Sequence, residues 1–194
     1  MTLLLVMLSY LMGSFPSAYL AGRRAKGIDI RKVGDKNAGA SNVYRHIGHR
    51  AAAIVIIADI AKGAIPVLIA KILVAEPHVL LCGLAALAGH VLPVFIGFKG
   101  GRGEATTIGV LLALLPKEMA IVLALSAIPY FLSRNLVLVG IAIFAPLPVL
   151  TWLMEASWVL VGYTLLLPCL VGLAHVLTTR KLSPEAKQES LFMR

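Results

Sequence analysis

Seven apolar stretches follow one another along the chain, separated by short polar segments, and they constrain the fold more than any other feature. A segment that enters lipid must satisfy its own backbone hydrogen bonds, and a helix does this within a single segment. The mean hydropathy of +0.91 and the hydrophobic content of 59% leave too little polar surface for an ordinary soluble domain. The sequence therefore predicts an all-α, polytopic integral membrane helical bundle with about seven transmembrane helices. The predicted spans are Leu3–Ala21, Ala51–Val74, Val79–Phe98, Ala105–Leu115, Met119–Leu132, Leu136–Met154 and Ser157–Thr178.

The fourth stretch, Ala105–Leu115, is shorter than the roughly 20 residues that cross the hydrocarbon core of a bilayer untilted. We expect it either to extend past Pro116 or to lie partly against protein.

Basic residues between the first two stretches predict the orientation of the bundle. The segment from Arg23 to Arg50 is rich in lysine and arginine and holds only two acidic residues, Asp29 and Asp35. Such loops stay on the cytoplasmic side, so we expect the N-terminus outside and the C-terminus in the cytoplasm. Residues 1–180 are expected to form a single transmembrane domain and residues 181–194 a cytoplasmic tail. The formal charge of +9 has the same origin, and no nucleic acid is expected as a partner.

The cysteines indicate neither a disulfide nor a zinc site. Cys82 and Cys169 both lie in apolar stretches, and the chain has no CxxC motif. We interpret both as small packed hydrophobic residues, and no metal site is predicted.

The segment Val33–Arg45, VGDKNAGASNVYR, is the most polar part of an otherwise apolar chain. Glycines allow a close approach of the backbone to a ligand, and small polar side chains among cations suit a phosphate ester better than a base. The alternative is an exposed basic loop, which explains the charge but not the asparagines. The candidate phosphate ligands here are Lys36, Asn37, Gly39, Ser41, Asn42 and Arg45.

A second glycine-bearing run, Gly100 to Thr107, precedes the fourth stretch. The amides of Gly100, Gly101 and Gly103 could face an anion at the positive end of a helix, with Arg102 as its cationic partner. The run is neither a Walker A loop nor a dinucleotide-binding motif. Taken alone, it is more typical of a tight turn between helices.

Ionisable residues inside the apolar stretches form a third group. Asp59 and Lys62 are three residues apart and share a helix face, so they form either a structural ion pair or part of a site. The structural pair is the interpretation we favour. His90 is expected to be a packing residue, whereas for His175, near the cytoplasmic end of the last stretch, packing and function remain equally open.

Four motifs in order resemble those of the bacterial acyl-phosphate:glycerol-3-phosphate acyltransferases, the PlsY family. They are GSFPSAYLAGR in the first stretch, VGDKNAGASNVYR, DIAKG from Asp59, and GHVLPVFIGFKGGRGEAT from Gly89. The resemblance spans roughly the N-terminal half, and the chain length and the expected helix count also fit. It implies transfer of an acyl group from acyl phosphate to the sn-1 hydroxyl of glycerol 3-phosphate, giving 1-acylglycerol 3-phosphate for phospholipid synthesis. No acyl-CoA, acyl carrier protein, metal or other cofactor is implied.

The resemblance also implies where the reaction takes place and which residues carry it. We expect a monomer in the bacterial inner membrane, acting on the cytoplasmic face with membrane lipid around it. Arg45 and Arg102 would hold phosphate, His175 or Asp35 would accept a proton, and Arg102 would also assist catalysis. Asp59, Lys62 and His90 would support the site.

Several residues depart from the family pattern. Asp35 and Lys36 stand where the family has Ser-Gly, Arg102 where it has Lys, and Glu104 where it has an apolar residue. His175 matches the family histidine, but Ala174, Val176 and Thr178 replace the arginines and asparagine usual around it. Two alternative functions follow: a diverged, catalytically silent relative that binds a phospholipid precursor, or an organic-phosphate transporter. The acyltransferase hypothesis requires Arg45 and Arg102 to lie close together at one face of the membrane.

Overall fold

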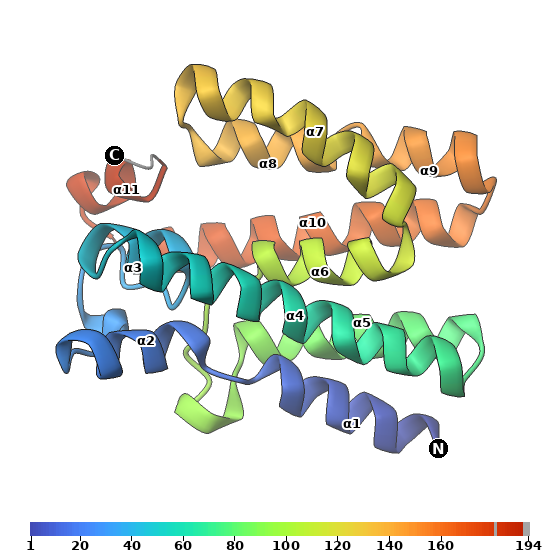
Figure 1. Ribbon diagram of the computed structural model, residues 1–194, viewed down its shortest axis with the longest axis horizontal. Coiled ribbons are helices and arrows are strands. Elements are labelled where there is room, and N and C mark those ends of the chain that lie inside the picture. The colour runs from blue at the N-terminus through green and yellow to red at the C-terminus, as the bar shows by residue number, and fades with distance from the viewer. Residues whose placement is uncertain (181, 192–194) are drawn as a thin grey trace.

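The computed structural model describes residues 1–180 and 182–191, and this part of the chain contains helices and no strands. Most of the helices run roughly parallel or antiparallel along one axis (Figure 1). In chain order the elements are α1 (Thr2–Gly13), α2 (Ser17–Lys26), η1 (Ile30–Lys32), α3 (Ala40–His46), α4 (His49–Leu73), α5 (Glu76–Val91), η2 (Val94–Ile96), α6 (Glu104–Leu114), α7 (Pro116–Ser133), α8 (Leu136–Phe144), α9 (Leu147–Glu155), α10 (Trp158–Thr179) and α11 (Pro184–Leu191).

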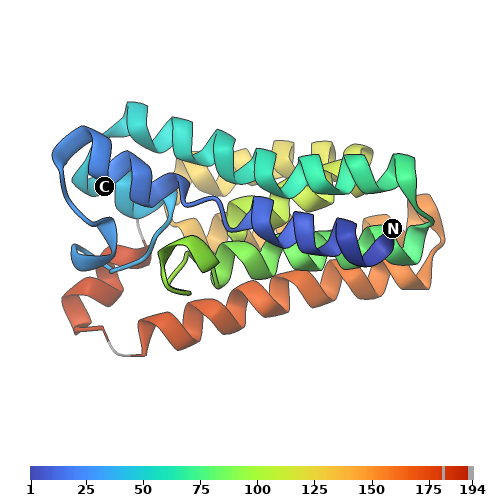
Figure 2. The same ribbon diagram turned by 90° about the horizontal axis from the view of Figure 1, so that it is seen from below.

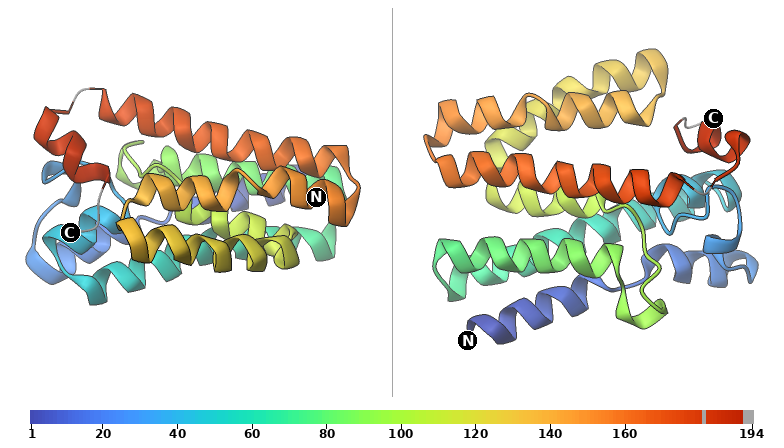
Figure 3. Two further views of the ribbon diagram at one scale, coloured as in Figure 1. Left: turned by 90° about the horizontal axis from the view of Figure 1, so that it is seen from above. Right: turned by 180° about the vertical axis from the view of Figure 1, so that it is seen from behind.

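The polar segments gather at one end of the bundle. Helices α2, α3 and α11 lie at this end, whereas the N-terminus and the turn from α9 to α10 lie at the other (Figures 1 and 2). Views from above and behind give the same arrangement (Figure 3). Of the expected tail 181–194, α11 is described, and residues 181 and 192–194 lie outside the described residues. The basic N-terminal loop and the described part of the tail therefore share one end, as a cytoplasmic face would require.

Five helical segments of the described chain are long and apolar enough to cross a membrane, by length and composition. They are Thr2–Lys26, His49–Leu73, Glu76–Ile96, Leu136–Glu155 and Trp158–Thr179. Helix α6 has 11 residues and spans roughly 16 Å at 1.5 Å per residue. Its residues Val110 and Leu111 are fully buried, so α6 packs against protein, as one of the two sequence alternatives required. The seven-span count and the orientation of the termini remain predictions.

Two predicted helices are interrupted. The expected helix Leu3–Ala21 is wrong at Ser14–Pro16, where α1 ends and α2 begins. The expected helix Leu136–Met154 is likewise divided into α8 and α9 at Ala145–Pro146. Proline lacks a backbone N–H, and its ring crowds the carbonyl four residues earlier. The first break leaves the carbonyl of Phe15 available to a side chain.

The third predicted helix, Val79–Phe98, also ends early. Helix α5 stops at Val91, shortly before Pro93, and the chain then makes the short helix η2. The residues after η2 turn back toward the bundle, since Gly100 N–H donates to the carbonyl of Val91 at 3.2 Å. This turn brings the segment that begins at Gly100 and leads into α6 back against the bundle.

Helices α4 and α6 pack with their backbones in close contact. A Cβ atom on Gly63 would collide with the carbonyl oxygen of Thr106, and one on Gly109 with the carbonyl oxygen of Ile60. Small residues at such crossings are typical of membrane helices. The contact places the start of α6, with its glycine-rich turn, beside the middle of α4.

Candidate anion-binding site

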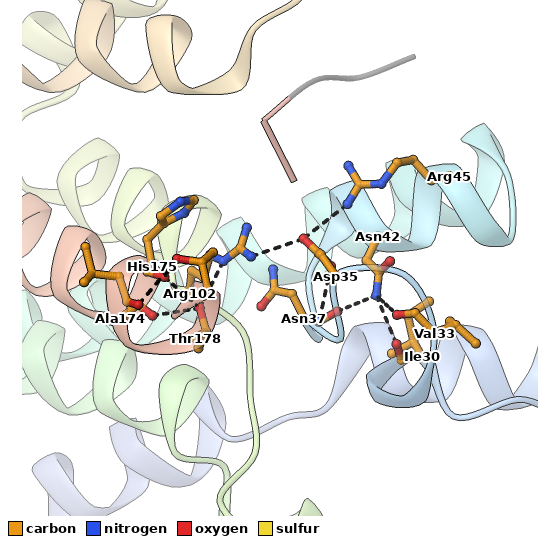
Figure 4. Close-up of polar contacts among 12 residues, drawn as sticks. Ile30, Val33, Asp35, Asn37, Asn42, Arg45, Arg102, Ala174, His175 and Thr178 are labelled. Carbon is orange, nitrogen blue, oxygen red and sulfur yellow. Dashed lines mark hydrogen bonds and ion pairs between the residues drawn. The ribbon is translucent and has the colours of Figure 1, made fainter. Parts of the chain in front are cut away.

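Arg45 and Arg102 converge on one carboxylate. Arg45 lies in the last turn of α3, and Arg102 lies in the turn before α6. The Nη2 atoms of Arg45 and Arg102 each lie 3.2 Å from Oδ2 of Asp35 (Figure 4). The geometry that the sequence required, two arginines from distant segments meeting at one place, is confirmed.

Asp35 is held in place by its own loop. It is 2% exposed, and its second oxygen, Oδ1, accepts the backbone N–H of Asn37 at 3.2 Å. Between them Lys36 takes the left-handed conformation with φ of 56°, which L-residues rarely adopt, and its side chain is exposed. The tight turn therefore directs Asp35 inward and Lys36 outward.

Asn42 shapes this loop from within. Its Nδ2 donates to the carbonyl oxygens of Ile30 at 3.0 Å, Val33 at 3.1 Å and Asn37 at 3.0 Å (Figure 4). The side chain is fully buried. The amide that was predicted to contact phosphate is thus already used to hold the backbone, and Asn42 supports the site from behind.

The other polar residues of the predicted loop lie close by with different roles. Asn37 is buried next to the turn, Gly39 is the N-cap residue of α3, and Ser41 is half-buried in the first turn of that helix. The side chain of Asn37 lies beside Asp35 in Figure 4.

The glycine-rich turn before α6 contributes structure and one side chain. The N–H groups of Gly100 and Gly101 donate to the carbonyls of Val91 and His90, both at 3.2 Å, and so attach the turn to α5. Gly103 is the N-cap residue of α6 in the left-handed conformation, with φ of 94°. The amides of Gly100 and Gly101, predicted as anion donors, are therefore occupied, and Arg102 is the group that reaches the site.

Arg102 is oriented from two sides. Its Nε donates to Oγ1 of Thr178 on α10 at 3.3 Å, and Thr178 donates to the carbonyl of Ala174 at 2.8 Å. Burial lowers the pKa of the Arg102 guanidinium, whereas the neighbouring Asp35 raises it. Because an arginine side chain keeps its proton in proteins, the group remains a cation. Thr178, which stands where the family has asparagine, thus makes a polar contact to the arginine.

His175 lies beside this arrangement. It is half-buried on α10, one turn before Thr178, and its ring lies near Arg102 in Figure 4. Thr178 contacts Arg102, and Figure 4 shows His175 on the same helix beside that arginine. The predicted position of His175 near the other polar segments is therefore confirmed.

A second polar cluster lies deeper in the bundle. Lys62 Nζ lies 2.8 Å from Oδ1 of Asp59 and donates to the carbonyl of Phe15 at 3.0 Å. Ser17 donates to the same Asp59 oxygen at 2.5 Å. The favoured interpretation, a buried ion pair that fixes helix packing, agrees with these bonds, because both charges are satisfied. Ser17 lies in the first motif but was not predicted as part of this cluster.

His90 belongs to the same region and contacts another missed residue. Its Nδ1 lies 3.0 Å from Oγ1 of Thr106, and both side chains are buried. The pair joins α5 to α6 and supports the turn that carries Arg102. Hydroxyl groups of this kind give no signal in a single sequence, because serine and threonine also occur at helix crossings without a partner.

An ion pair in the first loop ties two short helices together. Arg31 contacts Asp29 at 2.8 Å and donates to the carbonyl of Ile96 at 2.6 Å, which connects η1 to η2. The Arg31 side chain lowers the pKa of the Asp29 carboxyl. These residues were not predicted as part of the site, and they contact each other and η2.

The fold and the site define a class: an integral membrane protein of helices with two arginines that meet at a candidate anion site at one end. Residues 3–183 match the family described as glycerol-3-phosphate acyltransferase, and the chain belongs to this family.

Similar proteins cover almost the whole chain. "Glycerol-3-phosphate acyltransferase 4" of Dehalococcoides mccartyi is 41% identical over 182 residues, covering 93% of this chain and 98% of the relative. The glycerol-3-phosphate acyltransferase of Geobacter sulfurreducens is 39% identical over 181 residues, covering 93% of each chain. The crystal structure of PlsY, an integral membrane glycerol 3-phosphate acyltransferase, in its glycerol 3-phosphate form has a TM-score of 0.81 at 30% identity, covering 93% of this chain and 90% of that one. The lysophosphatidic acid form of PlsY has a TM-score of 0.80 at 28% identity, covering 96% and 98%.

Proposed function

We propose that the protein transfers an acyl group from acyl phosphate to the sn-1 hydroxyl of glycerol 3-phosphate and releases 1-acylglycerol 3-phosphate. The observation that carries the proposal is the convergence of Arg45 and Arg102, each 3.2 Å from one buried anionic oxygen. The similarity to PlsY with glycerol 3-phosphate gives the acceptor, and the form with lysophosphatidic acid gives the product.

The reaction requires little from the protein beyond alignment of the two substrates and positive charge near their phosphates. The acceptor hydroxyl oxygen attacks the acyl carbonyl carbon, the bond from that carbon to the phosphate oxygen breaks, and phosphate leaves with the bonding electrons. Both substrates carry negative charge, so two guanidiniums reduce their mutual repulsion and hold them in position. Acyl phosphate is already activated, and the remaining task is removal of the hydroxyl proton.

His175 is the better of the two proposed proton acceptors. Oδ1 of Asp35 accepts an N–H, and Oδ2 contacts two guanidiniums, so both of its oxygens are engaged. The imidazole of His175 lies at the rim of the same arrangement and is partly accessible. We assign proton acceptance to His175 and phosphate binding to the arginines.

We further propose that the enzyme acts as a monomer at the cytoplasmic face of a bacterial inner membrane. Basic residues gather at the end of the bundle that carries the site, as expected of a face that stays in the cytoplasm. In this position the soluble acceptor reaches the arginines from water, while the acyl chain of the donor lies among the helices.

The test is acyl transfer by the purified protein, with palmitoyl phosphate and labelled glycerol 3-phosphate as substrates. Arg45→Ala removes one charged donor, and losses of about 10²–10³-fold are typical when such a donor is removed from a site. Arg50→Ala is the matched control, because Arg50 is an exposed arginine in the first turn of α4. Full activity of folded Arg45→Ala would refute the assignment.

A second candidate function is favoured by one observation: Asp35 places a carboxylate where the bound anion is expected. A catalytically silent relative would bind glycerol 3-phosphate or acyl phosphate and release no product. The same assay, combined with a binding measurement, separates this function from catalysis.

A further inference from the structure

The carboxylate of Asp35 occupies the place between the two arginines that an anionic ligand would take. One of its oxygens lies 3.2 Å from a nitrogen of Arg45 and 3.2 Å from a nitrogen of Arg102. A phosphate bound by both guanidiniums would put an oxygen in the same position, since N–H donors of arginine reach phosphate and carboxylate oxygens at similar distances.

We propose that Asp35 is a built-in competitor of substrate phosphate: it neutralises the arginines in the resting enzyme and is displaced when phosphate binds. The proposal rests on the proposed function for the identity of the anion. It makes Asp35 a residue that sets affinity for the acceptor.

Displacement follows from charge. A phosphate monoester that approached the occupied pair would meet a carboxylate within contact distance, and like charges at such separation oppose each other strongly. Phosphate offers up to two negative charges and several oxygens, so it can contact both guanidiniums at once. The carboxylate bridges them through a single oxygen.

The loop around Asp35 gives the displaced carboxylate an alternative. Lys36 is exposed and next in the chain, and Asp35 is held to its turn by one hydrogen bond, from the N–H of Asn37 at 3.2 Å. On displacement, the Asp35 side chain would rotate away from the arginines, toward water and Lys36.

The arrangement has two opposite effects. In the absence of substrate, Asp35 removes the repulsion between two largely buried guanidiniums and so stabilises the folded protein. In the presence of substrate, the same contact must be broken, which weakens phosphate binding. A neutral residue at position 35 should therefore lower the stability of the unliganded protein and raise its affinity for phosphate.

The test compares Asp35→Asn and Asp35→Ser with the full-length protein in detergent micelles. Titration calorimetry measures the dissociation constants of inorganic phosphate and glycerol 3-phosphate at fixed salt. We expect both variants to bind each anion about ten-fold more tightly than the unchanged protein. The matched control is Asp29→Asn, since Asp29 is a carboxylate of the same loop that pairs with Arg31 instead. We expect less than a two-fold change for this control.

Thermal unfolding with and without phosphate gives a second readout. Without ligand, the Asp35 variants should unfold at a lower temperature than the unchanged protein. On saturation with phosphate, their melting temperature should rise by more than that of the unchanged protein. If a variant is too unstable for calorimetry, recovery of its folding by phosphate supports the proposal. Failure of phosphate to recover it counts against the proposal.

Unchanged or weaker phosphate binding in both folded variants would overturn the proposal and would make Asp35 a positioning residue for the arginines. The competitor role and the proposed reaction can be refuted independently of each other. If the variants bind more tightly and no protein makes product from palmitoyl phosphate, the proposed reaction is wrong and the competitor role holds. If the unchanged protein makes product and the variants bind no more tightly, only the competitor role is wrong.

Discussion

The amide nitrogen of Asn42 donates to three carbonyl groups that belong to different parts of one loop, those of Ile30, Val33 and Asn37. This single side chain closes the segment that carries Asp35. The sequence indicated that Asn42 matters, because a fully polar residue among glycines in an apolar chain is unusual. It could not indicate which way the amide points, since a loop donor and a ligand donor look alike in sequence.

Replacement of Asn42 by alanine should destabilise the protein. Three carbonyls would lose the amide as a donor, and those of Ile30 and Val33 would keep only a backbone N–H, which costs about 2–3 kcal/mol in total after water enters part of the site. We expect the melting temperature in detergent to fall by roughly 5–10 °C. Ser41→Ala is the stability control, because Ser41 is a half-buried neighbour on the same helix, and it should shift melting by less than about 2 °C. Equal melting of the two variants would contradict the loop-closing role of Asn42.

The helix boundaries show which features of the elements can be predicted from the sequence and which cannot. Hydropathy placed α4 and α10 within a few residues of their observed ends. Proline was ambiguous: Pro16 and Pro146 separate helices, whereas Pro66, Pro129 and Pro168 lie inside them. In a membrane protein, neighbouring groups can satisfy a carbonyl that a proline leaves free. Only the three-dimensional neighbours decide between a kink and a break.

The contact between α4 and α6 should be sensitive to a single methyl group. A Cβ atom on Gly109 has no room against the Ile60 carbonyl, so Gly109→Ala must push the helices apart. We expect a loss of about 1–3 kcal/mol, measured by thermal unfolding in detergent, and a loss of activity because α6 begins next to Arg102.

Gly172→Ala on α10 is the matched control for this variant, because a Cβ atom there meets nothing within 4 Å. It should leave stability unchanged or raise it slightly, by about 0.5–1 kcal/mol. If Gly109→Ala unfolds at the same temperature as Gly172→Ala, then stability does not depend on the close approach of α4 and α6.

For the molecule as a whole, the helical bundle and the grouping of its basic loops could be predicted, because both depend on composition. The convergence of Arg45 and Arg102 was required by the family resemblance more than by any local pattern, since the two residues are far apart in the chain. The bridging of both arginines by one oxygen of Asp35 has no signal of its own in the sequence. It depends on the turn at Lys36, where an L-residue adopts a positive φ.

The orientation of the whole molecule is testable by labelling. Single cysteines at Arg24 and Glu155 would report on opposite ends of the bundle, in a background with Cys82 and Cys169 replaced by alanine. Both positions are exposed. In spheroplasts, a membrane-impermeant maleimide should label the cysteine of Glu155→Cys at once and that of Arg24→Cys only after lysis. The reverse pattern would put the arginine site on the outer face and exclude a cytoplasmic acceptor.

By hydropathy alone, the first helix is an interchangeable anchor that inserts the chain. The break after α1 makes it a structural partner instead, since the Phe15 carbonyl receives Lys62 and the Ser17 hydroxyl is bonded to Asp59. A chimera whose N-terminal crossing came from an unrelated protein would still enter the bilayer. Lys62 would then have one acceptor fewer inside the bundle. The sequence of the first membrane crossing, and not only its hydrophobicity, therefore decides whether the rest of the protein assembles.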